Sequence, residues 1–170
     1  GEWYLTTSES YSPIHSYRFG GAGGGNYSNL EYDLLFSPVF DLTDVEHVKA
    51  SFYHRYITEL NWDSGFATAN IGDGEYHELG RFSGNHPDWT RDEVDLDDYI
   101  GKSIQIVFIF ESDLAIVSSG WWIDDFFLQE STAPPIVEIL EPSEGSEVSG
   151  QVATKADADD DVEVTKVEFY

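Results

Sequence analysis

The chain has 170 residues, 41% of them hydrophobic and 15% aromatic, which suffices for one folded core or for one domain and part of another. Its 33 Asp and Glu against 8 Lys and Arg give a formal net charge of −25, which argues against nucleic-acid and membrane-surface partners and favours cations. The absence of Cys excludes disulfides and thiolate metal sites, and no apolar run approaches the roughly 18 residues of a membrane span. Met is absent even at position 1, which predicts a piece of a longer chain.

Short β-branched and aromatic runs, separated by clusters of Gly, Asn, Asp and Pro, predict strands throughout, and no segment has a sustained helical period. The stretch GGAGGG at residues 20–25 is expected to form a flexible loop. The clearest strands are expected at residues 51–57, 65–71, 76–79, 103–110 and 121–128. Antiparallel strands with turns about every ten residues indicate an all-β fold, an antiparallel β-sandwich of the jelly-roll type.

A domain boundary is expected at residues 132–135, where Pro134 and Pro135 end the last strand and stiffen a short linker. We therefore divide the chain into a first domain at residues 1–131, the linker, and a partial domain at residues 136–170. The latter has room for about three strands, expected at residues 136–140, 147–152 and 164–170, which is too few for an independent sandwich. The acidic run at residues 157–161 lacks the glycine of an EF-hand loop and is interpreted as a solvated turn.

Several motifs give the two parts a family resemblance. The first part contains LFSPVFDL at residues 35–42, ELNWD at 59–63, YIGK at 99–102, FIFESD at 108–113 and GWWIDD at 120–125. Through these motifs, which stand in family order, residues 1–130 resemble the MAM-like jelly-roll module of extracellular bacterial and archaeal proteins, including secreted metallopeptidases of the immune inhibitor A type. Residues 134–170 resemble the first half of a bacterial Ig-like domain, through the segments at 135–145 and 164–169. In both families the module is an ancillary part, which implies that this chain is not an enzyme.

Enzyme motifs are missing from the sequence as well. The GKS at residues 101–103 is not a P-loop, because Leu96 stands where the motif needs Gly. GGAGGG does not satisfy the dinucleotide-binding fingerprint, and neither H-E-x-x-H nor G-x-S-x-G occurs. The five His residues have no ligand spacing, and His54, inside an expected strand, is interpreted as a packing residue. No carboxylate pair stands out for glycoside hydrolysis.

A group of acidic residues flanks the apolar strands: Glu59, Asp63, Asp113, Asp124 and Asp125. If their carboxylates converge, they need a divalent cation to offset their repulsion, and oxygen-only ligands suit Ca²⁺. Alternatively, each lies at a separate strand end and accepts hydrogen bonds from loop amides. The MAM-like resemblance favours a structural Ca²⁺, with Asp124 as the first ligand and Asp63, Glu59 and Asp113 as the others. Strand alternation should turn Asp125 to the opposite face.

The aromatic residues leave a second possibility open. Trp62, Trp89, Trp121 and Trp122 could form a platform for sugar rings, although alternation places at least one of Trp121 and Trp122 in the core. The sequence thus predicts a non-catalytic module of a secreted or cell-surface multidomain protein, plausibly a peptidase. The module would serve in binding or positioning for this larger protein and would be stabilised by calcium. Its partners would be other domains of the parent chain, or a protein or carbohydrate ligand. The alternatives are a carbohydrate-binding module and an architectural spacer.

Overall fold

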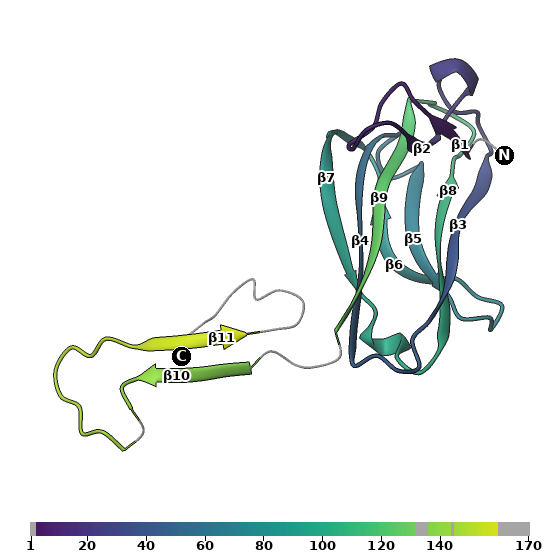
Figure 1. Cartoon of the computed structure of the whole chain (residues 1–170). Helices are drawn as coiled ribbons and strands as arrows, with labels where there is room; N and C mark the ends of the chain where they lie inside the picture. The colour runs from purple at the N-terminus through teal and green to yellow at the C-terminus, as the bar shows by residue number, and fades with distance from the viewer. Residues whose placement is uncertain (1–2, 132–135, 144, 160–170) are drawn as a thin grey trace.

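Two antiparallel sheets packed face to face form the main body of the computed structural model, which describes residues 3–131, 136–143 and 145–159 (Figure 1). The five-stranded sheet has the order β1 (Trp3–Thr6), β2 (Ser16–Phe19), β9 (Gly120–Ser131), β4 (His47–Ile57) and β7 (Asn85–Asp95). The four-stranded sheet has the order β3 (Tyr32–Asp41), β8 (Ser103–Glu111), β5 (Ser64–Asn70) and β6 (His77–Phe82). Two short 3₁₀ turns, η1 (Ala22–Gly24) and η2 (Asp97–Tyr99), lie in connections. The predicted all-β sandwich is confirmed.

The core between the sheets follows the two-residue period of the strands. In β8, Ile104, Ile106, Phe108 and Phe110 all belong to the buried cluster between the sheets. The intervening Val107 and Ile109 are buried on the other face of the same sheet, where side chains of the neighbouring strands β3 and β5 flank them. This central strand is therefore apolar on both faces, which explains why residues 106–110 form the longest continuous apolar run of the sequence.

Trp121 fills the middle of the core and sets the spacing of the sheets there. Its ring lies so close to β5 that a Cβ at Gly65 would be 2.4 Å from it. Its indole Nε1 donates a hydrogen bond of 3.2 Å to Nδ1 of His54, which is also buried. His54 packs edge-on against Phe52 and Phe82, so the structure places it in the core.

A β-bulge in β9 decides where the two adjacent carboxylates point. Asp125 has a φ of 43° and the pairing with β4 shifts between Ser51 and Tyr53. Trp121 and Ile123 face the core before the bulge, and Phe126 and Leu128 pack against it afterwards. The prediction that Asp125 faces away from Asp124 is therefore wrong: the extra residue breaks the alternation, and both carboxylates bond to Ser12 on the outer face.

The structure also corrects the expectation of a flexible loop at residues 20–25 and adds two short edge strands. Residues 20–25 form a turn closed by a 3.0 Å hydrogen bond from Gly21 N to Gly25 O, and Arg18 Nη2 donates to the same carbonyl at 2.7 Å. This glycine stretch is thus held by hydrogen bonds instead of being a free loop. Residues 3–6 and 16–19, which carry no clear period of their own, become strands because they pair in series at the edge of the larger sheet.

In the C-terminal part, β10 (Ile136–Glu141) and β11 (Lys155–Asp159) form a separate antiparallel pair, which lies outside the sandwich in Figure 1. The strand expected at residues 147–152 is wrong, since these residues belong to the connection between β10 and β11. The acidic run begins inside β11 and not in a turn, because Asp157 pairs with Glu138 in the ladder. The strand expected at residues 164–170 lies outside the described residues.

The buried His54 makes stability depend on pH. Burial is the main cause that lowers its pKa to about 4, and the nearby Asp92 only partly opposes this. In the unfolded chain the imidazole takes up its proton near pH 6.5, so stability is complete above that pH and is lost as pH falls towards 4. The pKa difference corresponds to about 3 kcal/mol.

We expect the unfolding free energy, measured by chemical denaturation, to fall more steeply between pH 6.5 and 4 in the native chain than in a His54→Gln variant. Gln keeps an acceptor for Trp121 but cannot be protonated. Equal slopes for the two proteins would contradict a buried neutral histidine.

Candidate functional site

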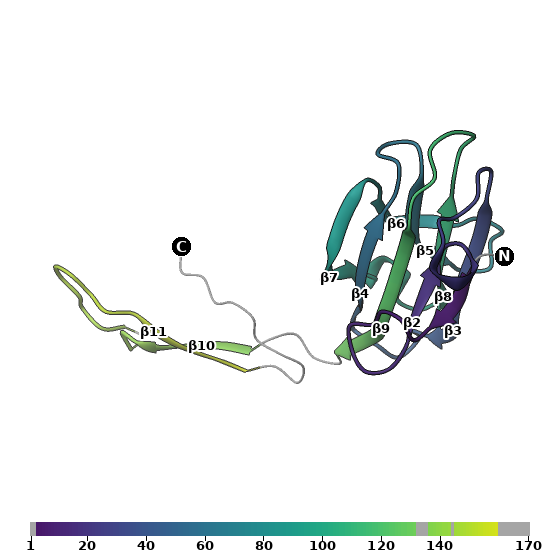
Figure 2. The same ribbon diagram turned by 90° about the horizontal axis from the view of Figure 1, so that it is seen from above.

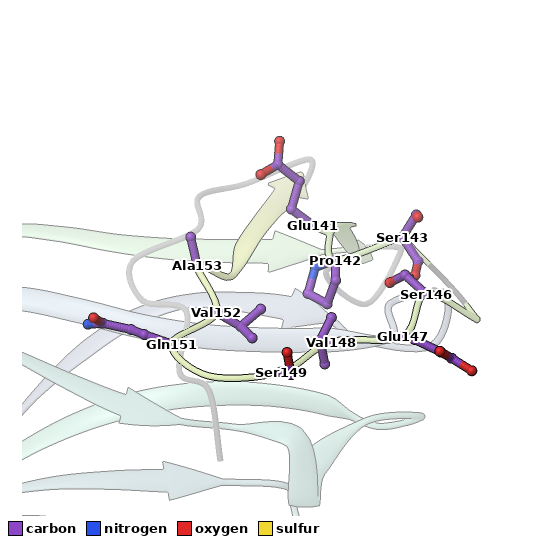
Figure 3. Close-up of a pocket in the computed structure, with 10 residues that line it drawn as sticks. All are labelled: Glu141, Pro142, Ser143, Ser146, Glu147, Val148, Ser149, Gln151, Val152 and Ala153. Atoms are coloured by element: carbon purple, nitrogen blue, oxygen red, sulfur yellow. The ribbon is translucent and has the colours of Figure 1, made fainter.

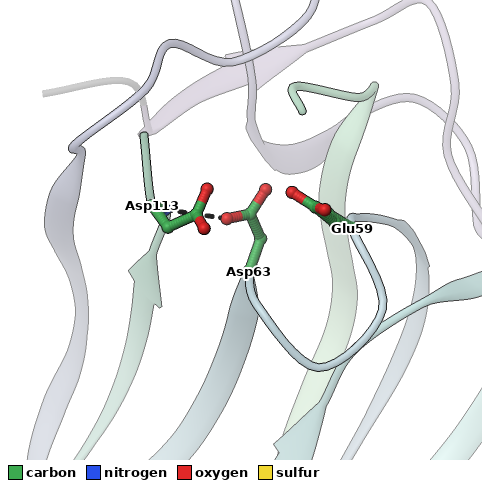
Figure 4. A group of neighbouring side chains, drawn as sticks. All are labelled: Glu59, Asp63 and Asp113. Carbon is green, nitrogen blue, oxygen red and sulfur yellow. Dashed lines mark hydrogen bonds between the residues drawn. The ribbon is translucent and has the colours of Figure 1, made fainter. Parts of the chain in front are cut away.

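Three carboxylates meet at one end of the sandwich. Glu59 and Asp63 lie in the loop between β4 and β5, and Asp113 lies in the loop between β8 and β9. One oxygen from each comes within 4.8 Å of the others, and Figure 4 shows the three side chains pointing towards one another. Asp113 lies 50 positions after Asp63 and 54 after Glu59, so only the folding of the two sheets brings it to them.

Asp63 is the centre of this group. It is 1% exposed, and its Oδ1 accepts a 2.8 Å hydrogen bond from the backbone N–H of Asp113. Its Oδ2 accepts a 2.5 Å bond from the hydroxyl of Tyr27, and its backbone oxygen accepts bonds from the hydroxyls of Thr58 and Ser83. One residue thus joins four connections of the sandwich.

The other two carboxylates are partly satisfied by the loop after β8. Oε2 of Glu59 accepts a 3.1 Å bond from the N–H of Ile116, and Oδ1 of Asp113 accepts a 2.7 Å bond from the N–H of Ala115. These bonds leave each side chain one further oxygen, and both residues are half-buried. Oxygens therefore remain for another ligand.

No basic side chain offsets the negative charge of the group. Within the part of the chain that the structure describes, none of the three carboxylates has a Lys, Arg or His nitrogen within 4 Å. Burial, together with the hydrogen bond to Asp63, raises the pKa of the Tyr27 phenol, so Tyr27 remains a neutral donor and adds no charge. Three close carboxylates with oxygen donors and no counter-ion have the chemistry of a Ca²⁺ site.

Asp124, the first ligand predicted from the sequence, does not belong to this group. Its Oδ2 accepts hydrogen bonds from the N–H groups of Tyr11 at 2.7 Å and Ser12 at 3.2 Å, and its Oδ1 accepts one from the N–H of Asp125 at 2.8 Å. The prediction that Asp124 shares an ion with the loop acids therefore has no support in the geometry. The alternative reading, a carboxylate bonded to loop amides, describes Asp124.

The segment that Asp124 holds is the connection between β1 and β2, residues 7–15, which we call the N-terminal strap. It lies against β2 and β9 on the outer face of the five-stranded sheet (Figure 2). Tyr11 of the strap stacks on Tyr53 with ring centroids 3.5 Å apart, and Glu9 forms an ion pair with Arg55. The acidic pair in GWWIDDFFL therefore fastens this strap to the sheet.

A stack of three side chains lies on the same face and could not be inferred from the sequence. The guanidinium carbons of Arg18 and Arg55 lie 4.6 and 4.9 Å from the ring centroid of Trp122. The three residues face one another across β2, β9 and β4, and Trp122 is only 3% exposed. The expectation that Trp121 and Trp122 take opposite faces is met, and Trp122 is covered and not a free sugar platform. Sequence spacing carries no signal for such a cross-strand stack.

A shallow hollow lies in the connection of the C-terminal hairpin (Figure 3). Its walls consist mostly of hydroxyl, carboxylate and short apolar side chains: Glu141, Pro142, Ser143, Ser146, Glu147, Val148, Ser149, Gln151, Val152 and Ala153. All ten residues come from one segment of the chain. This hollow brings no group of catalytic or metal-binding residues together.

Parts of this chain are similar in sequence to known proteins. The bacterial Ig domain family matches residues 135–170. Bacillopeptidase F of Bacillus subtilis is 30% identical over 115 residues, which are 67% of this chain and 8% of that protein. The match thus spans a small part of the peptidase. The MAM-like assignment stays a prediction from the motifs.

Solved structures share the fold at low sequence identity. The carbohydrate-binding module TmCBM61, solved with β-1,4-galactotriose, has a TM-score of 0.54 at 12% identity, covering 76% of this chain and 82% of its own. The cleaved adhesin domain of Lys-gingipain from Porphyromonas gingivalis has a TM-score of 0.50 at 15% identity, covering 75% and 80%. These likenesses establish the jelly-roll sandwich. No helix among the described residues has the length and hydropathy to cross a membrane.

The role of Asp124 can be tested by stability. Asp124→Ala removes the acceptor of three N–H groups, and we expect the unfolding free energy to fall by about 1–2 kcal/mol. Asp88→Ala, which truncates an exposed carboxylate on β7, should change it by less than about 0.5 kcal/mol. Equal effects of the two substitutions in denaturant titrations would show that Asp124 does not hold the strap.

Proposed function

We propose that this chain is a non-catalytic ancillary part of a secreted or cell-surface multidomain protein, a peptidase by its resemblance to Bacillopeptidase F. Residues 1–131 are the jelly-roll module, residues 132–135 the linker and residues 136–170 the opening part of an Ig-like domain. The match of the Ig family to residues 135–170 and the separate β10–β11 pair support this division. The module binds or positions other parts of the protein or an external ligand.

We also propose that the module holds a structural Ca²⁺ at the acidic group of the loop end. Glu59, Asp63 and Asp113 are the ligands, and among the described residues no Lys, Arg or His nitrogen lies within 4 Å of their carboxylates. Ca²⁺ takes six to eight oxygens, so water and backbone oxygens would complete the shell. A cation here would tie together the loops after β4 and β8, which Asp63 already links.

Calcium should therefore raise the melting temperature. A ligand at a hundredfold excess over its dissociation constant stabilises the folded state by about 2.7 kcal/mol. For a domain of this size that is roughly 5–10 °C. We expect a chelator to lower the melting temperature by this amount, calcium to restore it, and magnesium to restore it less.

Two variants separate the ligands from the other acids. Glu59→Gln with Asp113→Asn keeps the shape of both side chains and should abolish the calcium response in calorimetry. Asp124→Asn should retain it, because Asp124 lies outside the group. Calorimetry that detects no calcium binding to the native chain would refute the cation site.

A carbohydrate-binding role is the second candidate, and one face of the four-stranded sheet favours it. On the outer side of β3, Tyr32 is 58% and Phe36 is 50% exposed. Strand β8 lies between β3 and β5, and Phe66 is on β5. The guanidinium carbon of Arg81 lies 5.2 Å from the centroid of the Phe66 ring. Aromatic faces with a neighbouring charged donor can stack against and hydrogen-bond to sugar rings.

We expect this face to respond to a sugar panel that includes β-1,4-galactotriose and oligosaccharides of glucose, xylose and mannose. If the face binds sugar, Tyr32→Ala with Phe36→Ala should weaken binding by about 1 kcal/mol or more per ring, measured by calorimetry. Tyr76→Ala, an exposed aromatic residue between β5 and β6, serves as the control. No binding to any member of the panel would favour the spacer.

A further inference from the structure

Five large apolar side chains surround the acidic group and point into solvent. They are the loop-tip residues Leu30, Leu60, Trp62, Leu114 and Ile116, each between 61% and 73% exposed. They come from the three connections that precede β3, follow β4 and follow β8. We call this set the apolar loop tips.

Hydrogen bonds show that the loop tips belong to one surface. The N–H of Leu30 donates a 2.8 Å bond to the carbonyl of Asp113, and the side chain of Asn29 donates to the carbonyl of Leu114 at 2.9 Å. The N–H of Ile116 donates to the Glu59 carboxylate, and Leu60 follows Glu59 in the chain. All three connections therefore meet around the carboxylates drawn in Figure 4.

Exposure of this kind is unusual on a soluble domain. Single exposed apolar residues are common, but a contiguous group rimmed by polar side chains marks a contact surface. The loops before β3 and after β4 bury other residues, Tyr27 and Asp63, so their tips are not exposed for lack of a core. In the loops after β4 and β8, the largest apolar side chains are nevertheless exposed.

The chemistry of the surface narrows the kind of partner. Four of the five tips are aliphatic and offer no ring face, which disfavours a sugar. The chain carries a net charge of −25, and Glu31 and Glu111 flank the same loops, which disfavours anionic lipid. In the ranges 3–131, 136–143 and 145–159, no basic side chain forms an ion pair with the three central carboxylates. A partner that presents Lys or Arg beside apolar side chains complements both features.

We propose that the loop end is a protein-docking surface, on which the apolar loop tips receive a segment rich in Leu or Ile and the flanking Glu31 and Glu111 pair with its Lys or Arg. This inference rests on the proposed role as a binding or positioning module. It does not require the calcium ion, which would lie deeper, at the buried Asp63.

The test uses an amphipathic leucine–lysine peptide without aromatic residues and the fluorescence of Trp62. Trp62 is the strongly exposed tryptophan, since Trp3 and Trp89 are half-buried and Trp121 and Trp122 are buried. We expect a saturable blue shift in chelating buffer, absent from Trp62→Phe. Leu114→Ser with Ile116→Ser, assayed with Trp62 intact, should raise the dissociation constant at least about tenfold.

A matched pair on another surface supplies the control. Leu5→Ser with Tyr17→Ser removes two exposed apolar side chains that pair across β1 and β2, and affinity should stay within about twofold. Equal weakening by both pairs, or equal binding of a leucine–glutamate peptide, would overturn the proposal. So would a Trp62 shift with phosphatidylcholine vesicles but not with the peptide. Calcium calorimetry on the same samples keeps the two proposals separate: calcium binding without peptide binding refutes only the docking surface, and the converse refutes only the cation site.

Discussion

The loop end of the sandwich depends on one buried carboxylate. Burying a charge costs several kcal/mol unless hydrogen bonds or an opposite charge offset it. Asp63 obtains two side-chain hydrogen bonds from residues that lie 36 positions before it and 50 positions after it. Its backbone oxygen accepts two more, from Thr58 and Ser83. Four connections are therefore tied to one residue, and the neighbouring Glu59 and Asp113 are held close enough to share a cation because of it.

The two acidic motifs look alike in sequence but do different work. Asp63 is buried at the end of a loop, and two other carboxylates lie close to it. Asp124 lies inside a strand and accepts hydrogen bonds from backbone N–H groups of the N-terminal strap. The difference follows from what each side chain meets. Near Asp63 the loops supply two further acids, and near Asp124 the strap supplies amides and the hydroxyl of Ser12, which bonds to Asp125. The carboxylates around Asp63 repel one another and have the charge to attract a cation. The carboxylate of Asp124 already accepts hydrogen bonds from backbone N–H groups.

The surface of the sandwich has three regions that differ in the side chains they expose. The outer face of the five-stranded sheet is closed by the strap and by the stack of Arg18, Trp122 and Arg55. The outer face of β3 leaves Tyr32 and Phe36 open, and the loop end leaves five apolar side chains around the acidic group. An ancillary domain needs no catalytic residues, only surfaces of this kind on a rigid frame. The packing of Trp121 against Gly65 helps to supply that frame.

The sequence predicted the all-β class and the clearest strands, which the structure confirms, and a domain boundary at residues 132–135, which stays a prediction. These depend on local patterns: alternating residues in β4 and β5, a continuous apolar run in β8, and two prolines at the linker. It also singled out Glu59, Asp63 and Asp113 among 33 acids. The separation of Asp124 from these three residues could be seen only in the folded structure, because the bulge at Asp125 and the strap determine what Asp124 contacts. Pairing between distant segments likewise forms the short edge strands β1 and β2 and the cross-strand stack on Trp122. No local sequence pattern predicts such pairing.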